Sequence, residues 1–328
     1  MERREMEREN RPAEVGRQEP ENTPLPSMLT GLLKPNALGE GVNVLTPTLE
    51  ELSYPQPQSD FPARWASEAR FFDAMAEKVA ARLQPLDLRT VARYHEPDHP
   101  WFNKEFRFKL LGNLRGKQVL DVGCGEGSNS VLMAKYGARV TGVDISPGFI
   151  EVCKQRAKLD GVESQTEFHC SPLETVNLPV EAFDIIWGDG ILHHVIPELD
   201  TVLHHLMRWA KPGALFVFSE PVSLVPWVRK LRKGVPIHTD ATPDERPLEK
   251  AELSVIKRHL PNLEMKWFHL LGRLDRFILR DHNYERAPIG RKLLLDALGR
   301  ADELLLSVPQ LQALGGMCVM YGWKAGPQ

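Results

Sequence analysis

Between residues 118 and 221, short apolar runs alternate with longer segments in which apolar residues recur at helical spacing. This alternation predicts five strands, at 118–122, 139–143, 165–169, 183–187 and 214–219. Helices are expected in three of the gaps, near 128–136, 147–159 and 198–209. Strands that alternate with helices are typical of a parallel sheet with helices on both faces. The pattern therefore predicts an α/β fold with a doubly wound sheet.

The pattern changes on both sides of this alternation. The helices expected there lie at 61–83, 102–114 and near 248–259. A strand at 264–271 and a final strand at 316–324 are expected on either side of a helical insertion over about 274–306. Two late strands around an insertion fit an antiparallel edge on an otherwise parallel sheet.

These expectations divide the chain into three parts. Residues 1–58 begin with a charged, proline-bearing segment, and we expect a disordered or extended N-terminal arm. A helical cap is expected over 59–114. The main domain would take up 115–328, with helical insertions at about 222–260 and 274–306.

Composition argues against several classes of protein. The net charge is −3 and the pI is about 6.4, so the chain lacks the basic character of a general nucleic-acid binder. No apolar run is long enough to span a membrane, and the opening MERREMEREN is too charged for a signal peptide. The four cysteines form no CxxC pair, so we expect reduced thiols in a cytoplasmic protein.

The stretch VLDVGCGEGSN at 119–129 carries the clearest chemical signal. A buried strand runs into three glycines, which let the backbone approach a ligand closely, and the helix that follows offers free N–H groups. Asp121 lies inside the apolar strand, where an unpaired charge is costly, and a bound cation is a good candidate for its partner.

The spacing of this turn separates it from two other glycine-rich motifs. A P-loop requires a lysine after the glycines, and none is present. A dinucleotide fold has GxGxxG, whereas Ser128 stands where the third glycine of that motif belongs, which disfavours a nucleotide-dependent oxidoreductase. Asp144 closes the next strand, where a carboxylate accepts hydrogen bonds from ribose hydroxyls; the alternative is that Asp144 caps the next helix.

Four segments resemble a known family: VLDVGCGEGSNS (119–130), VTGVDIS (140–146), FDIIWGDGILHHV (183–195) and AKPGALFVFSEP (210–221). Together they are similar to class I S-adenosylmethionine-dependent methyltransferases, the group that includes ubiquinone/menaquinone-type and many natural-product enzymes. The resemblance covers about 112–221. It implies a Rossmann-like sheet with an antiparallel last strand, and S-adenosyl-L-methionine as cofactor.

The resemblance also implies roles for individual residues. Asp121 and the backbone of Gly123 and Gly125 would hold the methionine end of the cofactor, while Asp144 would bind its ribose. The full set of expected cofactor-binding residues is Asp121, Gly123, Cys124, Gly125, Asp144, Ile145, Ser171, Leu173 and Gly188. Ser171 departs from the family, which usually has an acid near this place beside the adenine.

Methyl transfer from a sulfonium is an in-line displacement, so a base is needed only when the acceptor must lose a proton. His193 and His194 follow the fourth strand, where open α/β sheets bind ligands, and are candidate bases; a structural role in the turn is the alternative. Glu220, before Pro221, is another candidate, with turn stabilisation as its alternative. No acidic cluster of the metal-dependent catechol type is apparent, so no metal is expected.

The long flanks carry many aromatic residues and suggest a covered, apolar acceptor pocket. We expect a small hydrophobic acceptor: a natural product, an isoprenoid or a lipid-like molecule. The basic run 228–233 is either a solvated helix face or a contact for an anionic group. An RNA or protein methyltransferase and a non-catalytic S-adenosylmethionine-binding scaffold remain alternatives, and the sequence leaves open whether the chain forms oligomers.

Overall fold

A computed structural model describes residues 61–225, 246–279 and 284–326. The expected N-terminal arm and the basic run 228–233 lie outside these residues.

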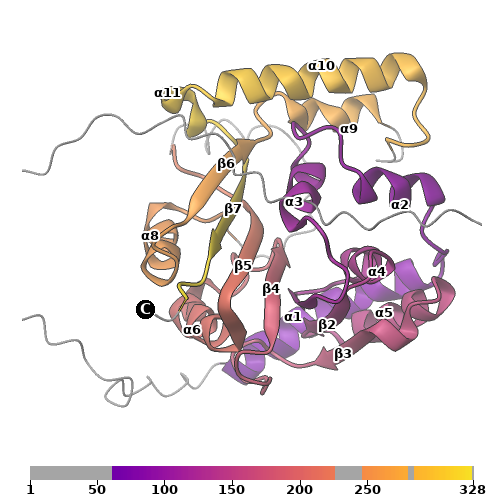
Figure 1. The fold of residues 1–328 in the computed structure, drawn as a ribbon, viewed down its shortest axis with the longest axis vertical. Coiled ribbons are helices and arrows are strands. Elements are labelled where there is room, and N and C mark those ends of the chain that lie inside the picture. Colours follow the sequence, from indigo (N-terminus) through magenta and orange to yellow (C-terminus); the bar gives the residue numbers. More distant parts are fainter. Residues whose placement is uncertain (1–60, 226–245, 280–283, 327–328) are drawn as a thin grey trace, which may run out of the picture. The chain divides into compact units, whose positions relative to one another are not determined.

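The described residues form a seven-stranded sheet in the order β3-β2-β1-β4-β5-β7-β6 (Figure 1). The strands are β1 Gln118–Val122, β2 Arg139–Asp144, β3 Thr166–Cys170, β4 Phe183–Asp189, β5 Ala210–Pro221, β6 Glu264–Phe268 and β7 Met317–Trp323. Strands β1 to β5 pair in parallel, whereas β7 is antiparallel to both β5 and β6. The predicted fold class, a Rossmann-like sheet with an antiparallel last strand, is confirmed.

The helices are α1 Phe61–Ala80, α2 Leu88–His95, α3 Asn103–Leu111, α4 Ser128–Lys135, α5 Pro147–Leu159, α6 Leu199–Trp209, α8 Lys250–His259, α9 Asp275–Ile278, α10 Ile289–Leu306 and α11 Pro309–Gln312. Helix α2 was not predicted from the sequence. It is only eight residues long and buries none of them fully. Its one local signal is Asp87, whose side chain caps the helix by accepting from the Arg89 N–H.

The central strands β1, β4 and β5 are largely apolar because both faces of the sheet are covered there. Adjacent residues of a strand point to opposite faces, so Leu120 and Ile186 enter one core and Val119 and Trp187 enter the other. All four side chains are fully buried or nearly so. The strand ends that matter for the site are therefore held by core packing on two sides.

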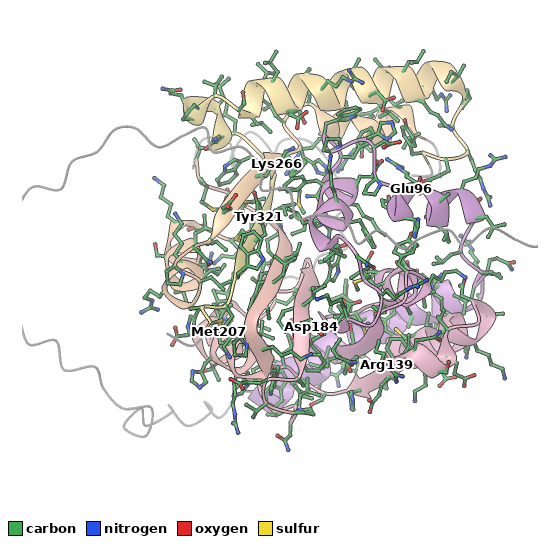
Figure 2. All side chains as sticks on the ribbon, viewed as in Figure 1. Glu96, Arg139, Asp184, Met207, Lys266 and Tyr321 are labelled. Atoms are coloured by element: carbon green, nitrogen blue, oxygen red, sulfur yellow. The ribbon has the colours of Figure 1, made fainter. Side chains whose placement is uncertain are left out.

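Strand β5 differs from its prediction at the start. Residues 211–213, which precede the predicted strand at 214–219, lie within β5, where the pairing with β4 shifts register. Gly213 supplies the left-handed backbone there, with φ of 77°. At this end of the sheet Asp184 (Figure 2) accepts hydrogen bonds from Lys211 and from the Gln118 N–H.

Candidate active site

The glycine turn between β1 and α4 has the backbone geometry that its sequence suggested. Gly123, Gly125 and Gly127 all have positive φ, at 64°, 51° and 77°. A Cβ on Gly123 would lie 2.6 Å from Ile191 Cδ1, and one on Gly127 would lie 2.7 Å from Cys153 Sγ. The missing side chains thus serve both the conformation and the close packing of the turn.

Asp144 ends β2 and faces this turn. Its Oδ2 accepts from the Gly125 N–H at 2.8 Å, and its Oδ1 accepts from the Ser146 N–H at 2.9 Å. The side-chain cap of α5 comes from Ser146, whose hydroxyl accepts from the Phe149 N–H. The alternative role of Asp144 as the cap of α5 therefore loses its support. Burial raises the pKa of Asp144, opposed by its hydrogen bonds and by the charge of His194.

A cavity of about 190 Å³ opens beside the turn, at the carboxyl ends of β1, β2 and β4. The residues expected at the site that line it are Gly123, Gly125, Asp144, Ile145, Ser171, Leu173 and His194. The expected residues that do not line it are Asp121, Cys124, Gly188, His193 and Glu220. Trp65, Glu68 and Phe72 of α1 complete the wall on the other side.

Asp121 has a different partner from the cation we expected. Its carboxylate is only 1% exposed, and its Oδ2 accepts from the Ser130 hydroxyl at 2.5 Å. Burial raises the pKa of Asp121 to about 7, although the Ser130 hydrogen bond acts in the opposite direction. Asp121 therefore joins β1 to α4 beneath the turn and does not reach the cavity.

An ion pair between a buried arginine and a half-buried carboxylate lies where β4 ends. Arg107 of α3 is 3% exposed, and its two terminal nitrogens each lie 3.0 Å from an oxygen of Asp189, which lines the cavity. Asn129 Nδ2 donates to the same carboxylate at 3.1 Å. Burial raises the pKa of Asp189, but the Arg107 charge and these hydrogen bonds outweigh it and hold the pKa below its ordinary value.

Arg107 was missed by the sequence analysis. Its guanidinium lies 4.7 Å from the ring centroid of Trp187, and its Nε has no hydrogen-bond partner among the described residues. A single arginine within a helix gives no local signal of burial. Only the packing of α3 against the ends of β4 and β5 brings it to the site.

The structure corrects the expected catalytic role of Glu220. The side chain is fully buried, and Oε1 accepts from the Ile191 and Leu192 N–H groups at 2.9 and 2.8 Å. Its Oε2 lies 2.8 Å from His193 Nδ1. Glu220 thus holds the loop after β4 in place and positions His193, and neither residue lines the cavity.

His194 is the histidine that faces the cavity. Its Nδ1 lies 3.5 Å from Glu68 Oε1 of α1, and its ring makes an edge contact with Phe72 at 5.5 Å between centroids. Helix α1 is itself fixed by Asp73, which accepts from the Ser146 hydroxyl at 2.6 Å and the Gly148 N–H at 2.9 Å. The helix that covers the cavity thereby also places a carboxylate beside His194.

Comparison with known proteins matches residues 120–218 to the methyltransferase domain family. This segment is a class I S-adenosylmethionine-dependent methyltransferase domain. The methyltransferase domain is similar to the ubiquinone biosynthesis O-methyltransferase of Coxiella burnetii (strain Dugway 5J108-111), with 32% identity over 150 residues. That match covers 42% of this chain and 63% of the relative.

A second relative, from Hahella chejuensis (strain KCTC 2396), has the same name and is 32% identical over 154 residues, covering 42% of this chain and 63% of its own. The chain thus spans less than two thirds of the curated relatives it matches. Among solved structures, geranyl diphosphate C-methyltransferase from Streptomyces coelicolor A3(2) aligns with a TM-score of 0.50 and 15% identity. The alignment covers 80% of this chain and 98% of that one, and it shows a shared fold.

S-adenosyl-L-methionine is the cofactor of this class of domain. In the described parts of the chain, no group of three or more His, Cys, Asp or Glu residues is placed to hold a metal ion. No helix within the described ranges has the length and apolar character needed to cross a membrane.

Proposed function

We propose that this protein transfers a methyl group from S-adenosyl-L-methionine to a small hydrophobic acceptor. The observation that carries the proposal is one cavity lined by three parts: a glycine turn, a ribose-type carboxylate (Asp144), and a second carboxylate (Asp189) that the buried Arg107 holds from behind. These parts match the chemically distinct ends of one cofactor.

The cofactor residues of this proposal follow from that arrangement. Asp144 accepts hydrogen bonds from the ribose hydroxyls, and Ile145 and Leu173 provide apolar contact for the adenine. The methionine end carries an ammonium and a carboxylate. Asp189 lines the cavity and suits the ammonium, and Arg107 holds the Asp189 carboxylate in place. This assignment moves the ammonium contact from Asp121 to Asp189.

When bound, S-adenosyl-L-methionine supplies an electrophilic methyl group on a sulfonium. The chain must align the acceptor with that methyl group and exclude water. Trp65 and Phe72 of α1 contribute apolar surface over the cavity, which suits a hydrophobic acceptor. The enclosing helix also favours a small molecule over the alternative acceptors, an RNA or a protein.

The relatives are named for O-methylation in ubiquinone biosynthesis, which favours a hydroxyl on an isoprenoid-like acceptor. A hydroxyl must lose its proton during transfer, and His194 lies at the cavity to receive it on a ring nitrogen. Glu68 would stabilise the imidazolium that forms. His193, held by Glu220, supports the loop that carries His194.

Two measurements test this function. Isothermal titration should show S-adenosylhomocysteine binding, weakened at least about ten-fold by Asp144→Ala, since a ribose contact of about 1.5 kcal/mol is lost. Glu96→Ala is the control, because the Glu96 side chain is 86% exposed (Figure 2). A folded wild-type chain that binds no cofactor would contradict the proposal.

The second measurement is transfer from methyl-labelled S-adenosylmethionine to a panel of hydroxylated isoprenoids, with the product identified by mass spectrometry. His194→Ala should lower kcat by about 100-fold and leave cofactor affinity closer to wild type than Asp144→Ala does. Label that appears only in RNA or protein would favour those acceptors. Cofactor binding without transfer to any fraction would favour a scaffold.

A further inference from the structure

Helix α10 is fixed firmly to the rest of the domain on its inner side. Its buried residues are Leu295, Gly299, Asp302 and Leu306. Asp302 accepts from the backbone N–H groups of residues 270–272, and Glu303 pairs with Lys266 of β6 at 2.6 Å (Figure 2). Trp101 fills the space beside Gly299. These contacts set which side of α10 faces outward.

The outward side of α10 is apolar, the reverse of an ordinary surface helix. At 100° per residue, the exposed residues fall opposite the buried ones. They include Leu293, Leu294 and Leu304, whose exposed fractions are 62%, 49% and 72%. Figure 1 shows α10 as the outermost labelled helix at its edge of the view. A continuous apolar stripe of this kind marks a surface that binds a partner.

The stripe is nearly palindromic about Gly299. Leu294 and Leu304 are equidistant from this centre, as are Leu293 and Leu305, and Ala297 and Ala301. The stripe follows the alternating spacings of four and three residues that form the seam of a coiled coil, at positions 290, 294, 297, 301 and 304. The two alanines at the centre allow a second helix to approach closely.

We propose that the partner is a second copy of this chain, with two α10 helices packed antiparallel about a two-fold axis near Gly299. An isologous interface requires a surface that complements itself. The palindromic stripe is such a surface, because Leu294 would meet the partner's Leu304 and Ala297 would meet the partner's Ala301. Arg300 is the charged residue of α10 nearest the seam. It lies over the Trp101 ring at 4.3 Å and faces the partner's Leu298, so like charges do not meet.

The charges of α10 favour this partner over a lipid surface. At its surface α10 carries Arg291, Lys292 and Arg300 beside Asp296 and Glu303, whereas Asp302 is buried, so the surface charges nearly balance. Helices that lie on membranes carry a strong basic excess that attracts anionic lipid, and the excess on α10 is a single charge. The self-association is independent of the proposed methyl transfer.

The first test is sedimentation velocity over a range of concentrations. The wild-type chain should sediment as a dimer, whereas the double variant Leu294→Glu/Leu304→Glu should sediment as a monomer, because four carboxylates would enter the seam. Leu88→Glu is the control, since Leu88 is 80% exposed on α2 and should leave the dimer intact. Unchanged thermal unfolding would show that the variants are folded. A wild-type monomer at every concentration overturns the proposal.

The second test fixes the orientation. In a Cys170→Ser background, which removes the exposed native thiol, Leu294→Cys and Leu304→Cys variants are mixed and oxidised with copper phenanthroline. The mixture should form a cross-linked dimer. Either variant alone should not, because ten residues along the helix separate its two thiols by about 15 Å. Cross-linking of each variant with itself, or flotation of a monomeric chain with phosphatidylglycerol vesicles, overturns the proposal.

Discussion

The two sides of the cavity are assembled in different ways. The donor side, around the glycine turn, is built from segments that are close in sequence. The hydrogen bond between Gly125 and Asp144 joins residues 19 positions apart, and the one between Ser130 and Asp121 joins residues nine positions apart. The covering side is built from distant segments, since Arg107 reaches Asp189 across 82 residues and Asp73 reaches Ser146 across 73. The first side can be inferred from a motif, whereas the second exists only once the chain has folded.

The largest effect is expected on the covering side, from Arg107→Ala. Removing the guanidinium leaves Asp189 beside the cavity without its main counter-charge; because Asp189 is 33% exposed, the cost should be about 2 kcal/mol, between the costs of losing a fully buried and an exposed pair. The loss of stability is measured as the change in the free energy of unfolding in urea. Arg258→Ala is the matched control, because the Arg258–Asp200 pair is largely exposed and its loss should cost less than about 1 kcal/mol. Equal losses in the two variants would contradict the buried-pair assignment.

On the donor side, Gly123→Ala should reduce both stability and cofactor affinity. The left-handed backbone costs an alanine about 1–2 kcal/mol, and its Cβ would meet Ile191 at 2.6 Å. Gly161→Ala separates the two causes: Gly161 also has a positive φ, of 71°, but open space around its Cα. That control should lose stability alone. If titration shows full cofactor affinity for Gly123→Ala, the close packing of the turn is not needed for binding.

A smaller change, Asp73→Ala, tests whether the two sides are coupled. It removes the acceptor that holds α1 to Ser146 and Gly148, at a cost of about 1–2 kcal/mol. Amide exchange should accelerate in α1, while β1 and β4 keep their protection. Acceleration spread evenly over the sheet would show that α1 is not a separate covering unit.

A pH dependence is also expected on the donor side. Burial raises the pKa of Asp121 from 3.8 to about 7, so the folded chain retains a proton that the unfolded chain releases. The resulting stabilisation is complete below pH of about 4 and is lost as the pH rises through about 7. Relative to Asp121→Asn, the wild-type free energy of unfolding should therefore fall between pH 5 and pH 8. A parallel pH profile in the two proteins would place the proton elsewhere.

The difference between the two sides also explains what the sequence could predict. Apolar runs located the strands, since strands buried on both faces leave a pattern that needs no partner to be recognised. Ser128 and the spacing of the glycines separated this turn from other nucleotide-binding turns. Asp144 could be singled out because it follows the turn by one strand.

Other assignments depended on contacts that no local pattern records. Asp121 was recognised as a buried charge, but its partner Ser130 is one of several hydroxyls nearby in sequence. Glu220 and His193 were both found as candidates, yet only the folded loop shows that one holds the other away from the cavity. Arg107 left no signal, because only tertiary packing buries it, and the short helix α2 was overlooked although Asp87 caps it.

The burial of Glu220 has a thermodynamic consequence for ligand binding. Its carboxylate already fixes the loop after β4 through three backbone N–H groups and one imidazole. The conformational entropy of that loop is therefore lost during folding and not during ligand binding. Binding at this edge of the sheet should carry little ordering penalty, which makes the loop a preorganised wall of the cavity.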